Sequence, residues 1–90
     1  MSVSLLITSK KIVMRFSNSQ KIVLNIFVKN IKIYVMKNKD TFTVSEKNIF
    51  HLELKRIREI KKIATFEQIK KSYENLFFSI IELNENKLGY

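Results

Sequence analysis

The stretch that decides the fold is residues 21–36, KIVLNIFVKNIKIYVM, the most apolar and most regular part of the chain. In residues 21–28 and again in residues 31–36, apolar side chains occupy every second position, and most of them are β-branched or aromatic. This period of two, with a break at Lys29–Asn30, predicts two β-strands joined by a short turn. The residues predicted to share the inward face are Ile22, Leu24, Ile26, Val28, Ile31, Ile33 and Val35.

The same alternation extends in both directions from this stretch. Residues 3–8 and 11–16 predict two earlier strands, and the polar run at residues 17–20, SNSQ, predicts a hairpin loop before residue 21. Residues 37–40 predict the next turn, and residues 41–44 predict a short strand after it.

Residues 45–64 allow two interpretations. In a helix capped by Ser45, with about 100° per residue, Glu53 would fall in the middle of the apolar face. Burying an unpaired charge there is costly. In a strand over residues 49–55, apolar and polar side chains would separate cleanly onto two faces. The strand is therefore favoured, with residues 57–63 as a connector or a helical turn, and the helix stays open as the alternative. The strand would turn Phe50, Leu52 and Leu54 inward and His51, Glu53 and Lys55 outward.

Residues 65–84 predict the clearest helix. Thr65, followed by Gln68 three residues later, forms a capping-box pattern. Apolar residues then recur every three or four positions from Phe66 to Leu83. Residues 84–90 are interpreted as a polar tail. The expected fold is a single α+β domain over residues 1–90, in which an antiparallel sheet of four to six strands (residues 3–55) packs on this C-terminal helix.

Charge is distributed unevenly along the chain. The net charge is +9, and residues 1–45 hold eight basic residues and a single acid, Asp40. Residues 46–90 hold nine basic and seven acidic residues. An AT-rich coding sequence also produces abundant Lys, Ile and Asn, so codon bias accounts for part of the charge. The asymmetry nevertheless favours one face made for a negatively charged partner.

Motifs for catalysis or cofactor binding are missing from the sequence. The only Gly is Gly89, so no Gly-rich phosphate loop or nucleophile elbow can form before it. With one His, one Asp and no Cys, neither a catalytic triad nor a metal-ligand spacing is found. We therefore expect a protein that is not an enzyme and has no cofactor and no metal site.

The sequence also gives an expectation for the compartment. No run approaches the ~18 apolar residues that a membrane span requires. The first residues match a signal peptide poorly, because no basic residue precedes the apolar run. With the lack of Cys, these features predict an intracellular protein, in the cytoplasm or in the matrix of an AT-rich organelle.

The outward face of the predicted sheet is the leading candidate site. It would carry cations beside two aromatic rings, and a single-stranded nucleic acid uses both, since Lys neutralises phosphates and a flat ring stacks on a base. This pattern favours a small RNA-associated protein, such as a subunit of a ribonucleoprotein. The other interpretation of the same face is packing against a second layer. The residues predicted to bind nucleic acid are Lys11, Arg15, Lys21, Asn25, Phe27, Lys32 and Tyr34.

The alternative function is a protein-interaction module, such as an adaptor, an inhibitor or an assembly subunit, from an AT-rich genome or a mobile element. Phe78 lies off the apolar stripe of the predicted helix, next to Ile81 at its edge. A surface aromatic residue of this kind often marks a contact with another chain. The contact would use these two residues or the uncovered part of the sheet. Binding to a membrane surface is a weaker third hypothesis, because the predicted sheet offers charge but no amphipathic helix to insert.

Overall fold

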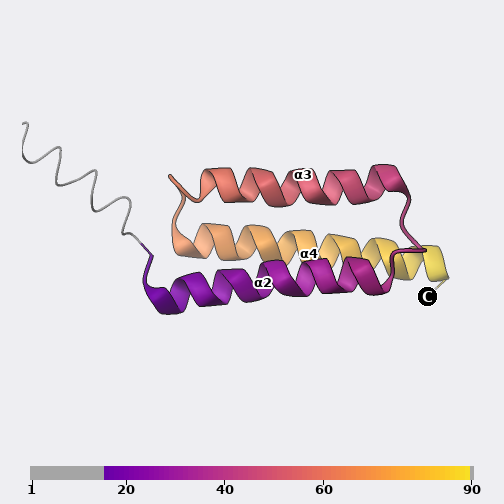
Figure 1. Ribbon diagram of the computed structural model, residues 1–90, viewed down its shortest axis with the longest axis horizontal. Helices are drawn as coiled ribbons and strands as arrows, with labels where there is room; N and C mark the ends of the chain where they lie inside the picture. The colour runs from indigo at the N-terminus through magenta and orange to yellow at the C-terminus, as the bar shows by residue number, and fades with distance from the viewer. Residues whose placement is uncertain (1–15, 90) are drawn as a thin grey trace, which may run out of the picture.

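Three α-helices form the fold in the computed structural model, which describes residues 16–89 (Figure 1). Helix α2 spans Asn18–Lys37, α3 spans Val44–Ile60 and α4 spans Phe66–Leu88. The described range contains no β-strand. The α+β prediction is therefore wrong for this range, and the part of the expected antiparallel sheet that falls on residues 16–55 is replaced by helices and their connections. Residues 3–15 of that predicted sheet lie outside the described residues.

Each helix begins with the same local motif, a capping box. The hydroxyl of a Ser or Thr accepts a hydrogen bond from the backbone N–H three residues later, and the Gln or Glu at that position accepts one from the N–H of the cap. The pairs are Ser17 with Gln20, Thr43 with Glu46, and Thr65 with Gln68, with bond lengths of 2.8–3.2 Å. The capping box predicted at Thr65 is confirmed. The loop predicted at residues 17–20 is instead the start of α2.

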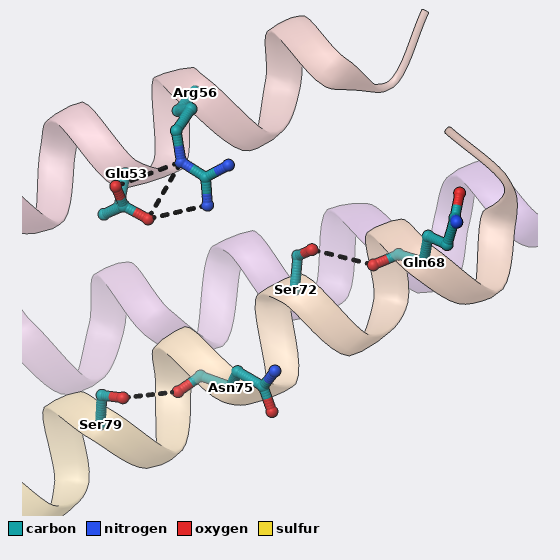
Figure 2. Close-up of polar contacts among 6 residues, drawn as sticks. All are labelled: Glu53, Arg56, Gln68, Ser72, Asn75 and Ser79. Atoms are coloured by element: carbon teal, nitrogen blue, oxygen red, sulfur yellow. Dashed lines mark hydrogen bonds and ion pairs between the residues drawn. The ribbon is translucent and has the colours of Figure 1, made fainter. Parts of the chain in front are cut away.

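Helix α4 continues past the predicted end. It runs to Leu88, so the expected polar tail over residues 84–90 is wrong up to that point. Gly89 then ends the helix at a φ of 83°, a left-handed conformation that suits a residue without Cβ. Within α4, Ser72 and Ser79 donate hydrogen bonds of 2.9 Å to the carbonyl oxygens four residues earlier (Figure 2). Both hydroxyls are thus satisfied inside the helix itself.

Helix α4 holds the other two helices together. In Figure 1, α4 lies between α3 and α2, and α3 runs antiparallel to both of them. The close helix pairs are α2 with α4 and α3 with α4, whereas α2 and α3 approach each other less closely. A groove therefore remains between α2 and α3.

The core is built from helix positions three, four or seven residues apart. On α2 the buried residues are Leu24 and Ile31, seven apart, as expected for one face of a helix. Phe42, in the loop before α3, is also buried, and its ring meets that of Phe50 edge to face at 5.1 Å. The inward set predicted for a sheet is thus divided between the core and the surface of α2. The full core consists of Leu24, Ile31, Phe42, Phe50, Leu54, Ile57, Ile69, Tyr73 and Ile80.

The strand favoured for residues 49–55 is wrong, because α3 covers them. The helix alternative is correct, although its cap is Thr43 and not Ser45. Glu53 does not create the expected burial penalty, since it forms an ion pair with Arg56 in which Nη2 and Oε2 are 3.0 Å apart (Figure 2). About half of each side chain stays exposed, so the carboxylate is both paired and hydrated. The same pairing raises the pKa of Arg56.

Candidate functional site

Of the seven residues predicted to bind nucleic acid, the five that the structure describes lie on two different sides of α2. Lys21, Asn25 and Lys32 are exposed and fall within about 40° of one another around α2. Phe27 and Tyr34 lie on the other side of the helix and pack against the core. Lys11 and Arg15, the other two members of the set, lie outside the described residues. The fold therefore separates the predicted phosphate contacts from the predicted stacking rings.

Tyr34 in particular is engaged inside the bundle. Its ring meets the Phe77 ring edge to face, with 5.7 Å between the ring centres. Its hydroxyl oxygen accepts a hydrogen bond of 2.9 Å from Nδ2 of Asn84, which is buried on α4. The Asn84 amide also donates to Oδ1 of Asn38 at 3.3 Å. A base could stack on Tyr34 only if these contacts were broken.

The residues predicted to contact protein lie together on α4. Phe78 is exposed, Ile81 is half-buried, and both line a shallow hollow with Glu82 and Glu85. This hollow carries negative charge. Nothing in the structure tests whether another chain binds there, so the contact stays a prediction.

A more developed site is the groove between α2 and α3. Its space is about 240 Å³, and its walls are mainly apolar, with Val35 and Met36 on α2 facing Phe50 and Leu54 on α3. Lysine and histidine side chains stand along its edges. The residues that line it are Ile31, Lys32, Val35, Met36, Lys39, Lys47, Phe50, His51 and Leu54.

A second hollow extends this groove along α3. It shares Lys32, His51 and Leu54 with the first and adds Lys55, Arg58 and Glu59. We call the two hollows together the basic groove. Along α3, the residues from Lys47 to Arg58 span about 16 Å at ~1.5 Å per residue, or three helical turns.

The edge of the basic groove is strongly positive. It holds five cationic side chains and one carboxylate, so with His51 neutral its net charge is +4. In the part of the chain that the structure describes, none of these five cations forms an ion pair. The carboxylate belongs to Glu59, whose Oε2 forms an ion pair with Nζ of Lys62 at 3.7 Å. The five cations are Lys32, Lys39, Lys47, Lys55 and Arg58.

Two acids of α3 outside the groove, Glu46 and Glu53, are paired with other residues. Glu46 pairs with Lys87 at 2.7 Å and so ties the start of α3 to the end of α4. The hydrogen bond from Lys87, followed by that from the backbone of Thr43, lowers the pKa of Glu46. Glu53 forms an ion pair with Arg56, and neither of them lines the groove. The apolar groove therefore keeps an uncompensated positive edge.

Sequence reasoning identified only Lys32 among the groove residues. It treated His51 as an isolated surface residue of a strand. The missed signal is the spacing of Lys47, His51, Lys55 and Arg58, which are three or four residues apart and so share one side of a helix. This spacing is meaningful only once residues 44–60 are taken as helical.

Two further findings concern the described residues alone. Residues 16–89 contain no group of three His, Cys, Asp or Glu side chains placed to hold a metal ion. None of α2, α3 and α4 is both long and apolar enough to cross a lipid bilayer.

Comparisons with known proteins add no further constraint on the function of the basic groove. No protein-family model matches the chain, and neither the curated proteins nor the solved structures give a match.

Proposed function

We propose that this chain is a helical protein-interaction module that binds an acidic amphipathic helix of a partner protein in the basic groove. In this mode of recognition, the apolar face of a helix lies in a groove and its charged flanks meet the edges. The single observation that carries the proposal is the apolar groove between α2 and α3 with a net charge of +4 along its edge.

The apolar walls favour a helix as the occupant. Val35, Met36, Phe50 and Leu54 come from two neighbouring helices that both rest on α4. A fourth helix seated between them would complete a four-helix arrangement and remove this surface from water. The span of about 16 Å would accommodate about 11 residues of the partner helix.

The charge at the edges favours an acidic occupant. The cations stand on both sides of the groove, with Lys32 and Lys39 on α2 and Lys47, Lys55 and Arg58 on α3. Glu or Asp residues on both flanks of a bound helix would therefore meet opposite charge. Such complementarity speeds association and rejects basic partners more than it adds affinity.

RNA binding remains the competing prediction. The positive edge would attract phosphates, but single-strand recognition also relies on exposed aromatic rings. Phe27 and Tyr34, the proposed stacking rings, pack against the core. The apolar walls of the groove would also stay exposed beside a nucleic acid backbone. We keep an intracellular compartment, the cytoplasm or an organelle matrix, as part of the proposal, because the chain has no Cys.

The proposal is tested with a synthetic helix. A labelled peptide of about 18 residues, with Leu along one face and Glu on both flanks, matches the groove in pattern and charge. A second peptide with Lys in place of every Glu is its control, and a labelled single-stranded RNA tests the competing prediction. Fluorescence anisotropy should show binding of the acidic peptide alone.

Variants then assign the binding to the groove. Lys32→Glu combined with Lys55→Glu should weaken the acidic peptide by about tenfold or more and allow the basic peptide to bind. Met36→Glu should also weaken it, because this exposed side chain lines the groove. Leu52→Glu is the matched control, since Met36 and Leu52 are 68% and 61% exposed and Leu52 does not line the groove.

The proposal would be refuted if the acidic peptide failed to bind the folded protein, or if neither groove variant changed its affinity. Binding of RNA alone would support the nucleic-acid prediction in its place.

A further inference from the structure

Helix α2 has a second apolar face, directed away from the bundle. Ile22, Ile26 and Ile33 are 58%, 51% and 38% exposed. At about 100° per residue, the three side chains fall within about 40° of one another, opposite the buried pair Leu24 and Ile31. We call these three residues the outer stripe. None of them lines the basic groove.

Lysines flank the outer stripe on both sides. Lys29 and Lys37 fall within about 40° to either side of its centre line. Over its whole length, α2 carries four Lys and no Asp or Glu. Within residues 16–89, no ion pair engages any of these four lysines. The outer face of α2 thus combines exposed isoleucines with uncompensated positive charge.

We infer that the outer stripe binds the surface of an anionic phospholipid bilayer, with α2 lying in the plane of the interface. Amphipathic helices bind membranes in this way when apolar side chains enter the boundary between headgroups and acyl chains and Lys residues meet anionic headgroups. The stems of Lys29 and Lys37 can lie along the apolar boundary while their ammonium groups stay at the level of the phosphates.

The distribution of charge over the bundle favours this orientation. Helix α4 packs on the opposite side of α2 and carries four Glu and three Lys. An anionic surface would therefore attract the α2 side of the molecule more strongly than the α4 side.

A bilayer fits the outer stripe better than the other occupants do. A second copy would bring two α2 helices together, each with four Lys and no acid, and like charges in contact oppose association. A partner protein would need an apolar surface with acidic residues placed to meet lysines on both sides of this helix face. A bilayer requires no such placement of residues, and its headgroups supply the opposite charge. The inference does not depend on the basic groove, which opens on another side of α2.

Vesicle co-sedimentation of the full chain tests the inference. Wild-type protein should bind vesicles of phosphatidylcholine with about 30% phosphatidylserine and should not bind vesicles of pure phosphatidylcholine. Ile22→Ser, Ile26→Ser and Ile33→Ser together should abolish binding, whereas Val44→Ser with Leu52→Ser, which removes exposed apolar residues from α3, should leave it unchanged. Circular dichroism establishes that each variant is folded.

The contribution of charge is measured separately. Each lysine at the surface changes the affinity about fivefold, so Lys29→Gln with Lys37→Gln should weaken binding by about 25-fold. Lys70→Gln with Lys71→Gln on α4 removes the same charge and should change it less than about twofold. Lys47→Glu with Lys55→Glu, which reverses two cations of the basic groove on α3 and leaves α2 unchanged, should still bind vesicles, so failure of one proposal is distinguished from failure of the other. No binding to the anionic vesicles, equal binding to both vesicle types, or a triple Ser variant that binds like wild type would overturn the inference. Self-association of the wild-type protein without vesicles would also overturn the inference if the triple Ser variant abolished it, because a second copy would then cover the outer stripe.

Discussion

Replacing Tyr34 with Phe should lower the free energy of unfolding by about 1–2 kcal/mol. The lost group is a hydroxyl oxygen that accepts a hydrogen bond of 2.9 Å from Nδ2 of Asn84. Asn84 is almost fully buried, and its own Oδ1 has no hydrogen-bond partner within the described residues. After the change, the amide would keep only the longer bond of 3.3 Å to Asn38. The Phe ring would retain the edge contact with Phe77 at 5.7 Å, so no cavity adds to the cost.

A double-mutant cycle isolates this hydrogen bond. Tyr34→Phe, Asn84→Leu and the double variant are unfolded in urea and followed by circular dichroism, with equal slopes required for comparison. The single change at Tyr34 should also lower Tm by about 4–15 °C. The double variant should lose less stability than the two single changes added together, because Asn84→Leu also removes the buried amide that Tyr34→Phe leaves without its hydroxyl partner.

Tyr73→Phe is the matched control. Tyr73 is equally aromatic and fully buried in the core, and burial raises the pKa of its hydroxyl, but that hydroxyl forms no hydrogen bond within residues 16–89. This control should change the stability by less than about 0.5 kcal/mol. A loss below about 0.3 kcal/mol for Tyr34→Phe, or single losses that add within that margin, would refute the assigned role of the Tyr34–Asn84 bond.

Three further predictions concern the fold. In urea unfolding, Ile31→Ala should lower the free energy of unfolding by about 2–5 kcal/mol and Ile33→Ala by less than about 1 kcal/mol. The reason is burial, since Ile31 is 0% and Ile33 is 38% exposed. Equal losses would instead match a strand, in which both residues share one face. Because Lys87 depresses the pKa of Glu46, the pair stabilises the fold fully above the ordinary value of 4.5, and this stabilisation is lost as the pH falls through the lower folded value. A series of Tm measurements from about pH 7 to pH 3 should therefore show a shallower acid loss in Lys87→Met, and identical profiles would contradict the pairing. Thr65→Ala should lower the stability by about 1 kcal/mol through loss of the α4 cap, and no change in thermal unfolding would argue against the capping box.

The sequence contained enough local information to place all three helix starts. A Ser or Thr followed three residues later by Gln or Glu stands at residues 17, 43 and 65, and each of these pairs forms a complete capping box. The same spacing at Ser79 and Glu82 lies inside α4 and marks no helix start. Of the three starts, only the one at residue 65 was recognised, because the first two precede stretches in which apolar residues alternate. The cap fixes a few backbone groups, whereas the β-branched residues of residues 21–36 favour a strand by propensity alone. Burial on α4 outweighs that propensity in the fold.

The site was less predictable than the helices. The basic groove requires α2 and α3 to rest on α4 without closing on each other, and a single sequence carries no signal for that spacing. Lys32 was identified because it lies on the outward face of the strand predicted over residues 31–36, and its exposure does not depend on that wrong assignment. Lys47, Lys55 and Arg58 were missed because a strand over residues 49–55 would scatter them. Asn84 could not be found either, since its burial depends on Tyr34 and Asn38, about fifty residues earlier in the chain.

The misleading strand pattern in α2 has a physical cause that bears on function. Leu24 and Val28 belong to the core face of the helix, and Ile22 and Ile26 belong to the outer stripe, so the two sets interleave at every second position. A helix with only a core face would have polar residues at Ile22 and Ile26, and the alternation would disappear. Exposed isoleucines are unfavourable in water and add nothing to the core, so packing within the bundle does not explain them. A surface that covers the outer stripe explains both the residues and the pattern, and the flanking lysines indicate that this surface is negatively charged.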